Sequence, residues 1–329
     1  MIVVFDGTCL ADGPITGVSR AFLNGLTAYA ANSTAAIYLL LPDGIEGPLP
    51  PGITVVPTPR GALRRQLLLP KLLRQLQADV LHSPVAAVPL RAPCPTIATV
   101  HDLPWRHADS GESASYWRRF ATRCALRSAS VVLAPSTFTL EAARSIAGHG
   151  AKLLLLPNGT TAPQCVVDPA LRLGPLLALG DDRHRKNRSA VRTACALARE
   201  RSESLPEICF AGPPDNYLDE PMKEQLLRGC RMLVQASRFE GFGMPVLEGL
   251  AHGIPTVCSD LPPFREIAGD AAIYVDPRSP ASIADGIVRA HEDAPLRTQL
   301  ASEGPLRAAR FTPNAVAAAW GQLHLALTR

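Results

Sequence analysis

The 329-residue sequence has few charged residues (19%), few aromatic residues (5%) and no long hydrophobic run. No apolar stretch approaches the roughly 20 residues that a membrane-spanning helix needs, and runs such as Leu153–Leu156 have the length of a strand. At 47%, hydrophobic residues are too frequent for a disordered chain. These features argue against a helical membrane protein and against an intrinsically disordered one. The length predicts about two domains.

The cysteines and the net charge exclude further classes. None of the eight cysteines forms a Cys-x-x-Cys pair, and most stand in apolar surroundings. This pattern predicts buried thiols in a reducing cytoplasm, and neither a disulfide framework nor a zinc site. A net charge of +4 is too small to indicate nucleic-acid binding. Because the first residues carry neither a basic stretch nor a small-residue cleavage site, we expect a buried strand there instead of a signal peptide.

Short apolar runs alternate with helical patterns along the whole chain, which is typical of α/β folds with parallel sheets. Residues 160–175 contain three prolines and a Gly-Pro step, and this break predicts a domain boundary. We therefore expect two Rossmann-like domains facing across a cleft, residues 1–163 and 164–312, with ligands at the carboxyl ends of the strands. Strands are predicted at 2–5, 36–41, 53–56, 79–81, 96–100, 131–134, 153–156, 176–179, 207–211, 232–235, 255–258 and 272–275, and helices at about 17–31, 62–77, 115–128, 138–148, 187–201, 216–229, 245–252, 280–292, 295–303 and 313–328.

The strongest motif, Ser-Arg-Phe-Glu-Gly-Phe-Gly-Met-Pro-Val-Leu-Glu-Gly, spans residues 237–249. The predicted strand ends at about Gln235, a glycine-containing loop follows, and a helix begins at Pro245. Proline suits the first helical position because no amide donor is needed there. Free amides at such a helix start bind anions such as phosphate. Glu240 and Glu248 flank the loop and can each accept hydrogen bonds from neighbouring sugar hydroxyls. Spacing alone equally allows a solvated Glu240 before the helix and an exposed Glu248 on it. The amides belong to Gly241, Phe242, Gly243 and Met244.

A basic turn between a predicted strand and a predicted helix is the second motif. It reads Gly-Asp-Asp-Arg-His-Arg-Lys-Asn over residues 180–187. Basic side chains at such a place can clamp a diphosphate and stabilise it as it departs. The alternative is a solvated basic turn. The candidate side chains are Arg183, Arg185 and Lys186.

Histidine and glycine at predicted strand ends give weaker signals. His101, followed by Asp102, ends a predicted strand, where its ring can hydrogen-bond a hydroxyl in the cleft. The alternative is a core histidine paired with Asp102. His82 and His107 are weaker candidates of the same kind. Gly17, in the run Ile-Thr-Gly-Val-Ser-Arg after the first strand, allows close backbone approach at a helix start.

The Glu-x7-Glu segment resembles the signature of retaining GT-B glycosyltransferases and, more narrowly, of the glycosyltransferase group 1 (family 4) enzymes. The resemblance continues through residues 251–277, and the rest of the chain fits the same order. It implies a GT-B fold whose last helix, within residues 313–329, packs back on the first domain. It also implies a nucleoside-diphosphate sugar as donor and no cofactor. The Thr-Gly-Val-x-Arg, His-Asp-Leu and Arg-Lys-Asn runs favour GDP-mannose.

The resemblance also assigns roles. Glu240 would contact the donor sugar, Glu248 the ribose, and His101 the sugar near the reaction centre. Lys186 and Arg185 would stabilise the departing diphosphate. Further donor contacts are implied for Gly17, Gly241, Phe242, Gly243, Met244 and Arg183.

Two departures from the family pattern open alternatives. Asp181 stands where many members have an arginine, which Arg183 is a candidate to replace. The stretch 213–229 is too short for the strand, loop and helix that members have there, so the second domain is shortened by about one βα unit. The alternative reading is a non-catalytic GT-B scaffold that binds a sugar, a nucleotide or a partner protein. A sugar epimerase or a dehydrogenase is a third reading, although the dehydrogenase lacks its Gly-x-Gly-x-x-Gly run.

The remaining expectations concern metals, acceptor and location. Because no Asp-x-Asp or His-Glu-x-x-His run is present, we predict metal-independent chemistry. A saccharide or lipid-linked acceptor in bacterial surface polysaccharide assembly fits the resemblance, in the cytoplasm or at the inner face of the cell membrane. Basic residues amid leucines could contact an anionic membrane, although a solvated face is the alternative. They are Arg64, Arg65, Lys71 and Arg74, with a second group at Arg118, Arg119, Arg123 and Arg127.

Overall fold

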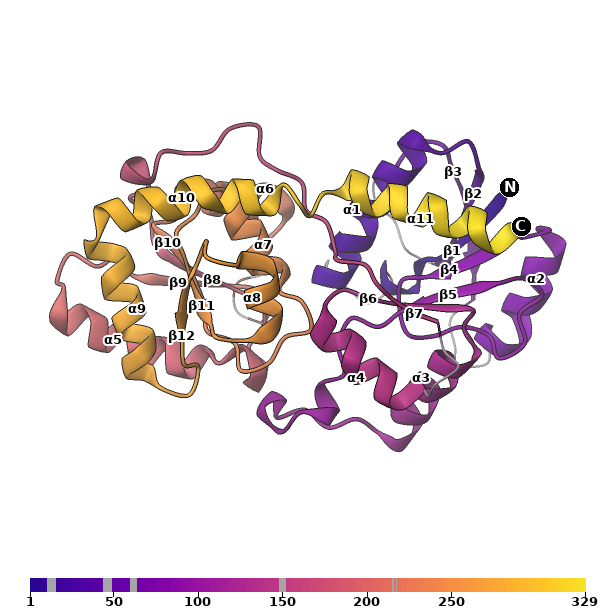
Figure 1. The fold of residues 1–329 in the computed structure, drawn as a ribbon, viewed down its shortest axis with the longest axis horizontal. Coiled ribbons are helices and arrows are strands. Elements are labelled where there is room, and N and C mark those ends of the chain that lie inside the picture. Colours follow the sequence, from indigo (N-terminus) through magenta and orange to yellow (C-terminus); the bar gives the residue numbers. More distant parts are fainter. Residues whose placement is uncertain (11–15, 44–48, 60–63, 148–151, 215, 217) are drawn as a thin grey trace. The chain divides into compact units, whose positions relative to one another are not determined.

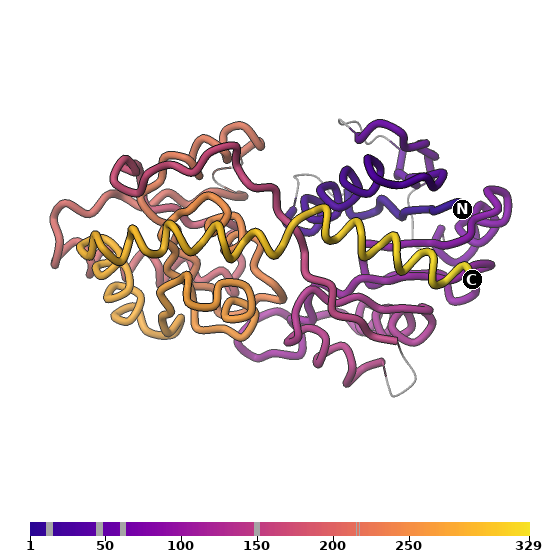
Figure 2. Tube along the Cα trace, turned by 45° about the horizontal axis from the view of Figure 1, so that its top comes forward, coloured from indigo at the N-terminus to yellow at the C-terminus, as the bar shows by residue number. Residues whose placement is uncertain are grey.

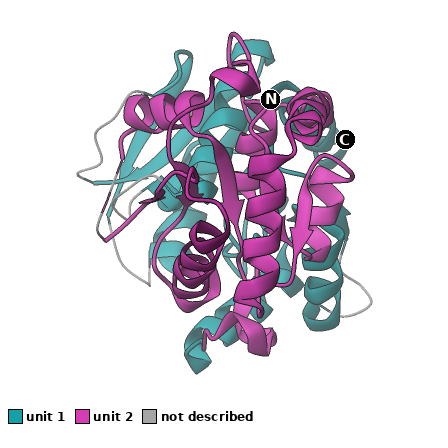
Figure 3. Cartoon of the chain, turned by 90° about the vertical axis from the view of Figure 1, so that its left-hand side faces the viewer, with its two compact units in different colours: residues 1–103, 114–159, 313–329 teal, residues 104–113, 160–312 magenta. Residues whose placement is uncertain are grey.

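The computed structural model describes residues 1–10, 16–43, 49–59, 64–147, 152–214, 216 and 218–329. The chain divides into two compact units (Figure 3). Unit 1 comprises residues 1–103, 114–159 and 313–329, and unit 2 comprises residues 104–113 and 160–312. The boundary predicted after residue 163 therefore falls a few residues late. The short segment 104–113 was expected in the first domain, yet it packs with unit 2.

Unit 1 is built on a parallel sheet of seven strands in the order β3-β2-β1-β4-β5-β6-β7 (Figure 1). Its central strands are buried on both faces, which is why they appear in the sequence as continuous apolar runs. Val3, Val4 and Phe5 of β1 are fully buried. The strands are β1 (Ile2–Asp6), β2 (Ala36–Pro42), β3 (Ile53–Thr58), β4 (Val80–Ser83), β5 (Thr96–Thr99), β6 (Val131–Ala134) and β7 (Leu153–Leu155).

Helices cover both faces of this sheet. Val3 and Phe5 pack with Trp320 on the face of α1 and α11, whereas Val4 packs with Leu69 of α2 on the other face. Figures 1 and 2 show α11 lying along α1, as their contacts require. The last helix therefore belongs to the core of unit 1. The helices are α1 (Gly17–Asn32), α2 (Leu69–Gln75), α3 (Tyr116–Ser128), α4 (Thr137–Ala147) and α11 (Pro313–Thr328).

Unit 2 contains a second parallel sheet, of five strands, in the order β12-β11-β10-β8-β9. Its strands are β8 (Leu176–Leu179), β9 (Ile208–Ala211), β10 (Met232–Gln235), β11 (Thr256–Ser259) and β12 (Ile273–Val275). Its helices are α5 (Arg188–Arg201), α6 (Glu220–Gly229), α7 (Met244–Ala251), α8 (Pro262–Ala268), α9 (Pro280–Glu292) and α10 (Ala294–Ala308).

The connection from β9 to β10 agrees with the predicted loss of one βα unit. β9 is an edge strand, and the chain returns from it through α6 to β10, on the other side of β8. Among the described residues of this connection there is no strand. The predicted helix at 216–229 begins later, at Glu220, and Tyr217 lies outside the described residues.

α2 is shorter than the helix predicted at 62–77, and residues 64–68 before it form a π-helix. Two further helices also differ from the sequence prediction. The pattern does not predict α8, because Pro262 and Pro263 suggest a turn. Both stand in the first helical turn, where no amide donor is needed, and the helix buries Phe264. α10 continues past Gly304 and Pro305, where a helix end was expected. Close packing of Gly304 on the backbone of α7 favours the longer helix.

A fully buried arginine anchors the chain that leads into unit 2. Arg172 is 1% exposed. Its guanidinium donates to the main-chain carbonyls of Leu227, Arg228 and His252, at 2.8, 3.1 and 2.5 Å. These carbonyls lie at the ends of α6 and α7, where a helix dipole favours a cation. Burial lowers the pKa of Arg172, and the carbonyls accept hydrogen bonds from both terminal nitrogens of its guanidinium.

Candidate functional site

The strand order of unit 2 reverses between β8 and β10. β9 lies beside β8, and β11 and β12 lie beyond β10. The loops after β8 and β10 therefore diverge at the carboxyl edge of the sheet, which is where open parallel sheets bind ligands. Lys186 follows β8 and Glu240 follows β10, so the topology brings together side chains 54 residues apart.

Lys186, Arg185 and Glu240 form a buried ion cluster at this edge. Nζ of Lys186 lies 2.6 Å from Oε1 of Glu240, and the guanidinium of Arg185 lies 3.4 Å from Oε2. The hydroxyl of Ser237 donates to the same carboxylate at 2.9 Å. Burial raises the pKa of Glu240, but Lys186 and Arg185 outweigh burial and hold it below its ordinary value. We therefore expect this carboxylate to be charged at neutral pH.

Main-chain contacts fix the basic turn that carries the two cations. Asn187 adopts a left-handed conformation, with φ of 59°, which asparagine tolerates better than most residues. Its amide group donates to the carbonyls of Ala236 and Pro277 at 2.9 and 2.7 Å. The amide of Arg238 donates to the carbonyl of Arg185 at 2.8 Å. The turn is thus attached to the loops after β10 and β12, and Asn187 is its anchor.

The glycine loop leads into a helix as predicted, one residue earlier than expected, at Met244. Gly243 has φ of 118°, and an added Cβ would lie 2.5 Å from the ring of Phe264. The loop therefore requires glycine at this position. The first amides of α7 lack helical acceptors and favour an anion. Gly241 and Phe242, also predicted to contribute amides, are buried in the same loop.

Glu248, the second glutamate of the signature, is held by a lysine that the sequence did not single out. Oε1 of Glu248 lies 2.7 Å from Nζ of Lys223 on α6, and both side chains are buried. Glu240 and Glu248 are thus each paired with their own lysine. Lys223 was missed because its Lys-Glu-Gln surroundings resemble an ordinary exposed helix face.

Arg183 was a candidate to replace the arginine that Asp181 displaces. Its guanidinium instead pairs with Asp181 itself at 2.7 Å and with Glu112 at 3.4 Å. Its side chain is half-exposed. Burial raises the pKa of Asp181, but Arg183 outweighs burial and holds it below its ordinary value. The positive charge of Arg183 is therefore largely balanced by its neighbour.

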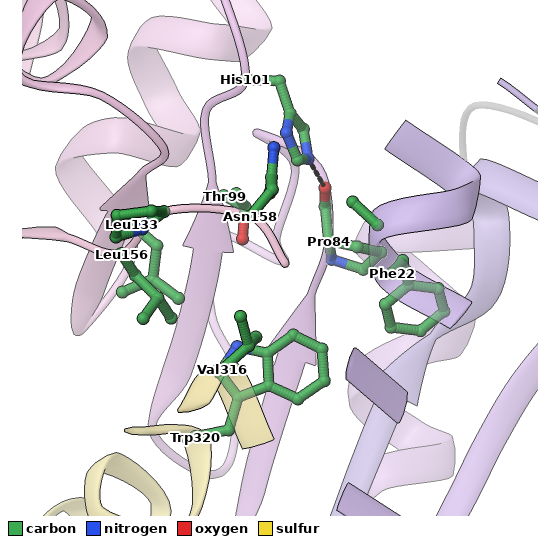
Figure 4. Close-up of a pocket in the computed structure, with 11 residues that line it drawn as sticks. Phe22, Pro84, Thr99, His101, Leu133, Leu156, Asn158, Val316 and Trp320 are labelled. Atoms are coloured by element: carbon green, nitrogen blue, oxygen red, sulfur yellow. Dashed lines mark hydrogen bonds between the residues drawn. The ribbon is translucent and has the colours of Figure 1, made fainter. Parts of the chain in front are cut away.

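His101 lines a small pocket of unit 1 together with Pro84, Thr99 and Asn158 (Figure 4). Its Nε2 donates to the carbonyl of Pro84 at 2.8 Å, which leaves Nδ1 as an acceptor when the ring is neutral. Burial lowers the pKa of His101, and it outweighs the Pro84 carbonyl and Asp102, which raise it. A neutral ring of this kind can receive a hydrogen bond from a hydroxyl.

The two weaker histidine candidates have different surroundings. His82 lies in the core of unit 1, with Nδ1 at 3.1 Å from Nε2 of His324, so the core interpretation holds for it. His107 belongs to the segment 104–113, where its ring centroid lies 4.9 Å from that of Phe239 in unit 2. These contacts give both rings a structural role.

Gly17 begins α1, as the sequence predicts. The hydroxyl of Thr16 caps the helix by accepting a hydrogen bond from the amide of Ser19 at 3.2 Å. Ile15, the first residue of that motif, lies outside the described residues. The predicted contact of Gly17 with a donor stays a prediction.

Sequence reasoning missed a buried carboxylate at the point where the strand order of unit 1 reverses. Asp6 ends β1 beside β4 and is fully buried. The guanidinium groups of Arg64 and Arg65 each lie 3.4 Å from it. Arg64 was expected on an exposed basic face, but this pairing buries its side chain to 6% exposure. Two cations on one carboxylate leave an excess positive charge at this edge.

Over the described ranges, His, Cys, Asp and Glu side chains form no group of three that could hold a metal ion. Within the same residues, no helix combines the length and hydropathy required to cross a bilayer. All eight cysteines are free thiols. Burial was predicted for them, but only Cys195, Cys230 and Cys258 are buried, four are partly buried and Cys165 is exposed.

The two Rossmann-like parallel sheets match the GT-B fold of solved glycosyltransferase structures. Residues 26–162 match the family described as Glycosyltransferase Family 4, and residues 177–307 match Glycosyl transferases group 1. Together the two matches cover most of the sequence. The chain therefore belongs to the group 1 glycosyltransferases.

Curated relatives match over shorter stretches. The chain is 31% identical over 96 residues to O-antigen chain mannosyltransferase B of Escherichia coli, which is 29% of this chain and 25% of that protein. It is 39% identical over 72 residues to the serotype-specific mannosyltransferase WbdA of Escherichia coli, 22% of this chain and 9% of that protein. The matched stretch thus spans a quarter or less of these relatives.

Solved structures match over nearly the full length. Sucrose-phosphate synthase from Thermosynechococcus elongatus has a TM-score of 0.77 at 16% identity, covering 99% of both chains. Anabaena HepE in complex with UDP-glucose has a TM-score of 0.70 at 16% identity, covering 99% of this chain and 100% of that one. WaaG, a glycosyltransferase involved in lipopolysaccharide biosynthesis, has 0.70 at 13%, covering 98% and 99%. At these identities the likeness shows the fold.

Proposed function

We propose that this protein is a retaining glycosyltransferase that moves a hexose, with mannose favoured, from a nucleoside-diphosphate sugar to a saccharide or glycolipid acceptor. The cluster of Lys186, Arg185 and Glu240 at the switch point of unit 2 is the observation that carries it. Two cations converge there beside the start of α7, as a departing diphosphate requires. GDP-mannose as the donor is supported by the names of the curated relatives.

In the proposed reaction, the bond between the anomeric carbon and the diphosphate oxygen breaks, and a bond to the acceptor oxygen forms on the same face of the sugar. The acceptor hydroxyl gives its proton to the departing diphosphate. Lys186 and Arg185 stabilise the negative charge that develops on this leaving group. No protein carboxylate acts as nucleophile, in contrast to the two-carboxylate retaining glycosidases. No metal ion is required in this scheme.

The remaining residues bind and orient the substrates. Glu240, kept ionised by its cations, accepts hydrogen bonds from hydroxyls of the donor sugar. Glu248, oriented by Lys223, accepts from the ribose. His101 presents Nδ1 to a sugar hydroxyl, since its Nε2 is committed to Pro84.

A non-catalytic scaffold is the second candidate function, and one feature favours it. The connection between β9 and β10 contains α6 without a strand in its described residues, and that region forms part of the nucleotide pocket expected from the family. Asp181, which stands where many family members have an arginine, also favours a scaffold without a donor site. Under this candidate, the fold is retained and the donor site is not.

Nucleotide-dependent stabilisation separates the two candidates. GDP at about 100 times its dissociation constant is expected to stabilise the wild type by roughly 2.7 kcal/mol, which shifts its melting temperature measurably. UDP, ADP and dTDP are compared under the same conditions. Lys186→Ala and Glu248→Ala are expected to lose the response. A cooperative melt that none of the four nucleotides shifts supports the scaffold, and turnover of a nucleotide sugar without acceptor supports an epimerase.

We also propose contact with an anionic membrane at the cytoplasmic face, where a lipid-linked acceptor for surface polysaccharide would lie. Support comes from α3, whose Tyr116, Trp117 and Phe120 are 84%, 66% and 46% exposed and flank two arginines in the sequence. Exposed aromatic and basic side chains on one helix suit a lipid surface.

Vesicle binding tests the membrane contact. The protein is expected to co-sediment with vesicles that contain anionic lipid and to stay in solution with neutral ones. The double variant Trp117→Ser and Phe120→Ser is expected to reduce binding about tenfold, because it removes the exposed rings from α3. Equal binding by the variant and the wild type would contradict the contact.

A further inference from the structure

Residues 104–113 form a strap across the carboxyl edge of the sheet in unit 2, although the chain before and after them belongs to unit 1 (Figure 3). Asp109 pairs with Arg278, which follows β12, at 2.6 and 2.7 Å. The ring of His107 lies 4.9 Å from that of Phe239, in the loop after β10. The strap thus contacts the loops that border the proposed donor site.

The second half of the strap lies on the basic turn itself. Gly111 has φ of 64°, and an added Cβ would lie 2.5 Å from Nδ1 of His184, so strap and turn are in close contact. The next residue, Glu112, places Oε1 at 2.8 Å from Nε of Arg185 and at 3.4 Å from the guanidinium of Arg183. The side chains of Glu112 and Arg185 are 19% and 9% exposed. This ion pair is therefore largely shielded from solvent.

Glu112 changes the charge of the proposed diphosphate site. Arg185 and Lys186 contribute two positive charges, and Glu240 contributes one negative charge. With Glu112 docked, these four side chains sum to zero, and without it they sum to one positive charge. A nucleoside diphosphate carries at least two negative charges, so it meets a neutral cluster while Glu112 is present. The diphosphate of the nucleotide and the carboxylate of Glu112 are both anions that can pair with the guanidinium of Arg185, so they compete for it.

We propose that Glu112 is a placeholder for the donor diphosphate: nucleotide binding displaces its carboxylate from Arg185 and releases the strap. This inference rests on the proposed function and adds a regulatory step to the same site. His101 lies three residues before the strap. Release of the strap therefore also releases a constraint on the backbone next to His101. Donor binding in unit 2 is in this way coupled to the position of His101 in unit 1.

The affinity for GDP tests the placeholder directly. Glu112→Gln keeps the shape of the side chain and removes its charge. We expect its dissociation constant for GDP, measured by calorimetry at fixed salt, to fall about five- to tenfold, where tenfold equals 1.4 kcal/mol. Asp109→Asn weakens the other end of the strap and leaves Glu112 intact, so we expect a two- to threefold fall. Asp285→Asn, which removes the partner of the exposed Arg201 elsewhere in unit 2, is the matched control and should leave the constant unchanged.

Hydrogen exchange gives a second readout. GDP is expected to speed amide exchange in residues 104–113 of the wild type while it protects residues 240–244. In Glu112→Gln the strap should exchange quickly without GDP. Tighter binding together with faster exchange supports the proposal. Unchanged or weaker binding by Glu112→Gln, or slower strap exchange with GDP, overturns it while leaving the proposed function intact. If neither the wild type nor Glu112→Gln binds GDP, UDP, ADP or dTDP, the proposed function fails as well.

Discussion

Lys186→Met is expected to reduce sugar transfer roughly 10²–10³-fold, the usual effect of removing one group that stabilises developing charge. Lys186 makes the shorter of the two cation contacts with Glu240 and packs beside Gly180 at the end of β8. The variant therefore loses both a partner of the leaving group and the main support of the carboxylate proposed to hold the sugar. Release of GDP from GDP-mannose, with water or a mannoside as acceptor, measures the loss.

A double variant separates catalysis from folding. Removing one partner of a buried ion pair costs about 3–5 kcal/mol, because the other charge stays buried, whereas removing both is often close to neutral. Lys186→Met with Glu240→Gln is therefore expected to recover much of the stability that Lys186→Met loses, as measured by urea unfolding. Its transfer activity should stay low. Recovery of transfer along with stability would show that the cluster supports folding and not catalysis.

The effect on Glu240 provides a further check. Because Lys186 and Arg185 hold the pKa of Glu240 down, Lys186→Met should raise it. The acid limb of the residual pH–rate profile should then move to higher pH. Arg201→Gln, which removes an exposed partner of Asp285, should change stability by less than about 1 kcal/mol and leave the profile unchanged.

The parallel sheets could be predicted from the sequence because buried strands carry their own signal. The twelve predicted strands are all present, with ends shifted by at most two residues. Strands covered on both faces read as short, continuous apolar runs, and turn residues separate them. The sequence also placed Lys186 and Glu240 after strands of the same domain, where open parallel sheets bind ligands, but it did not predict that the two side chains pair with each other.

The partners that complete the site could not be predicted, because nothing local distinguishes them. Lys223 and Glu112 stand in ordinary polar surroundings, and Arg172 stands between two leucines. Each is shielded from solvent only through contacts with distant segments. Arg64 was misjudged for the same reason, as its partner Asp6 lies 58 residues away. Charged residues are normally exposed unless paired, and the sequence does not reveal which pairs form.

Acidification is expected to destabilise unit 1 through a histidine pair between β4 and α11. Nδ1 of His82 lies 3.1 Å from Nε2 of His324, and Nδ1 of His324 lies 2.9 Å from the hydroxyl of Tyr29. Both rings are buried among aromatic side chains, including Trp320. Burial lowers the pKa of His324 to about 4. Burial, with a smaller contribution from His324, places the pKa of His82 well below its ordinary value.

The sign follows from proton counting. Unfolded histidine titrates near pH 6.5, so between about pH 6.5 and 4 the unfolded chain binds more protons than the folded one. The contribution of the neutral histidines to the free energy of unfolding is therefore fully present above pH 6.5, and it declines as the pH falls through this window. For His324 the whole decline is about 3 kcal/mol, of which about 2 kcal/mol is reached at pH 5. Losses of this size are a substantial part of the stability of a typical domain.

Urea unfolding between pH 7 and pH 5, followed by tryptophan fluorescence, measures this decline above the range where most carboxylates titrate. His324→Gln should reduce the loss of stability between pH 7 and pH 5 by about 2 kcal/mol in total, or about 1 kcal/mol per pH unit on average, since one proton is no longer taken up on unfolding. Histidines away from this pair that have lowered pKa values, such as His101, contribute equally to both proteins and cancel in the difference. Thr328→Ala, one turn further along α11, removes a hydroxyl that donates to the carbonyl of His324 and should keep the wild-type slope. Equal slopes for the wild type and His324→Gln would mean that the docking of α11 does not depend on a neutral histidine pair.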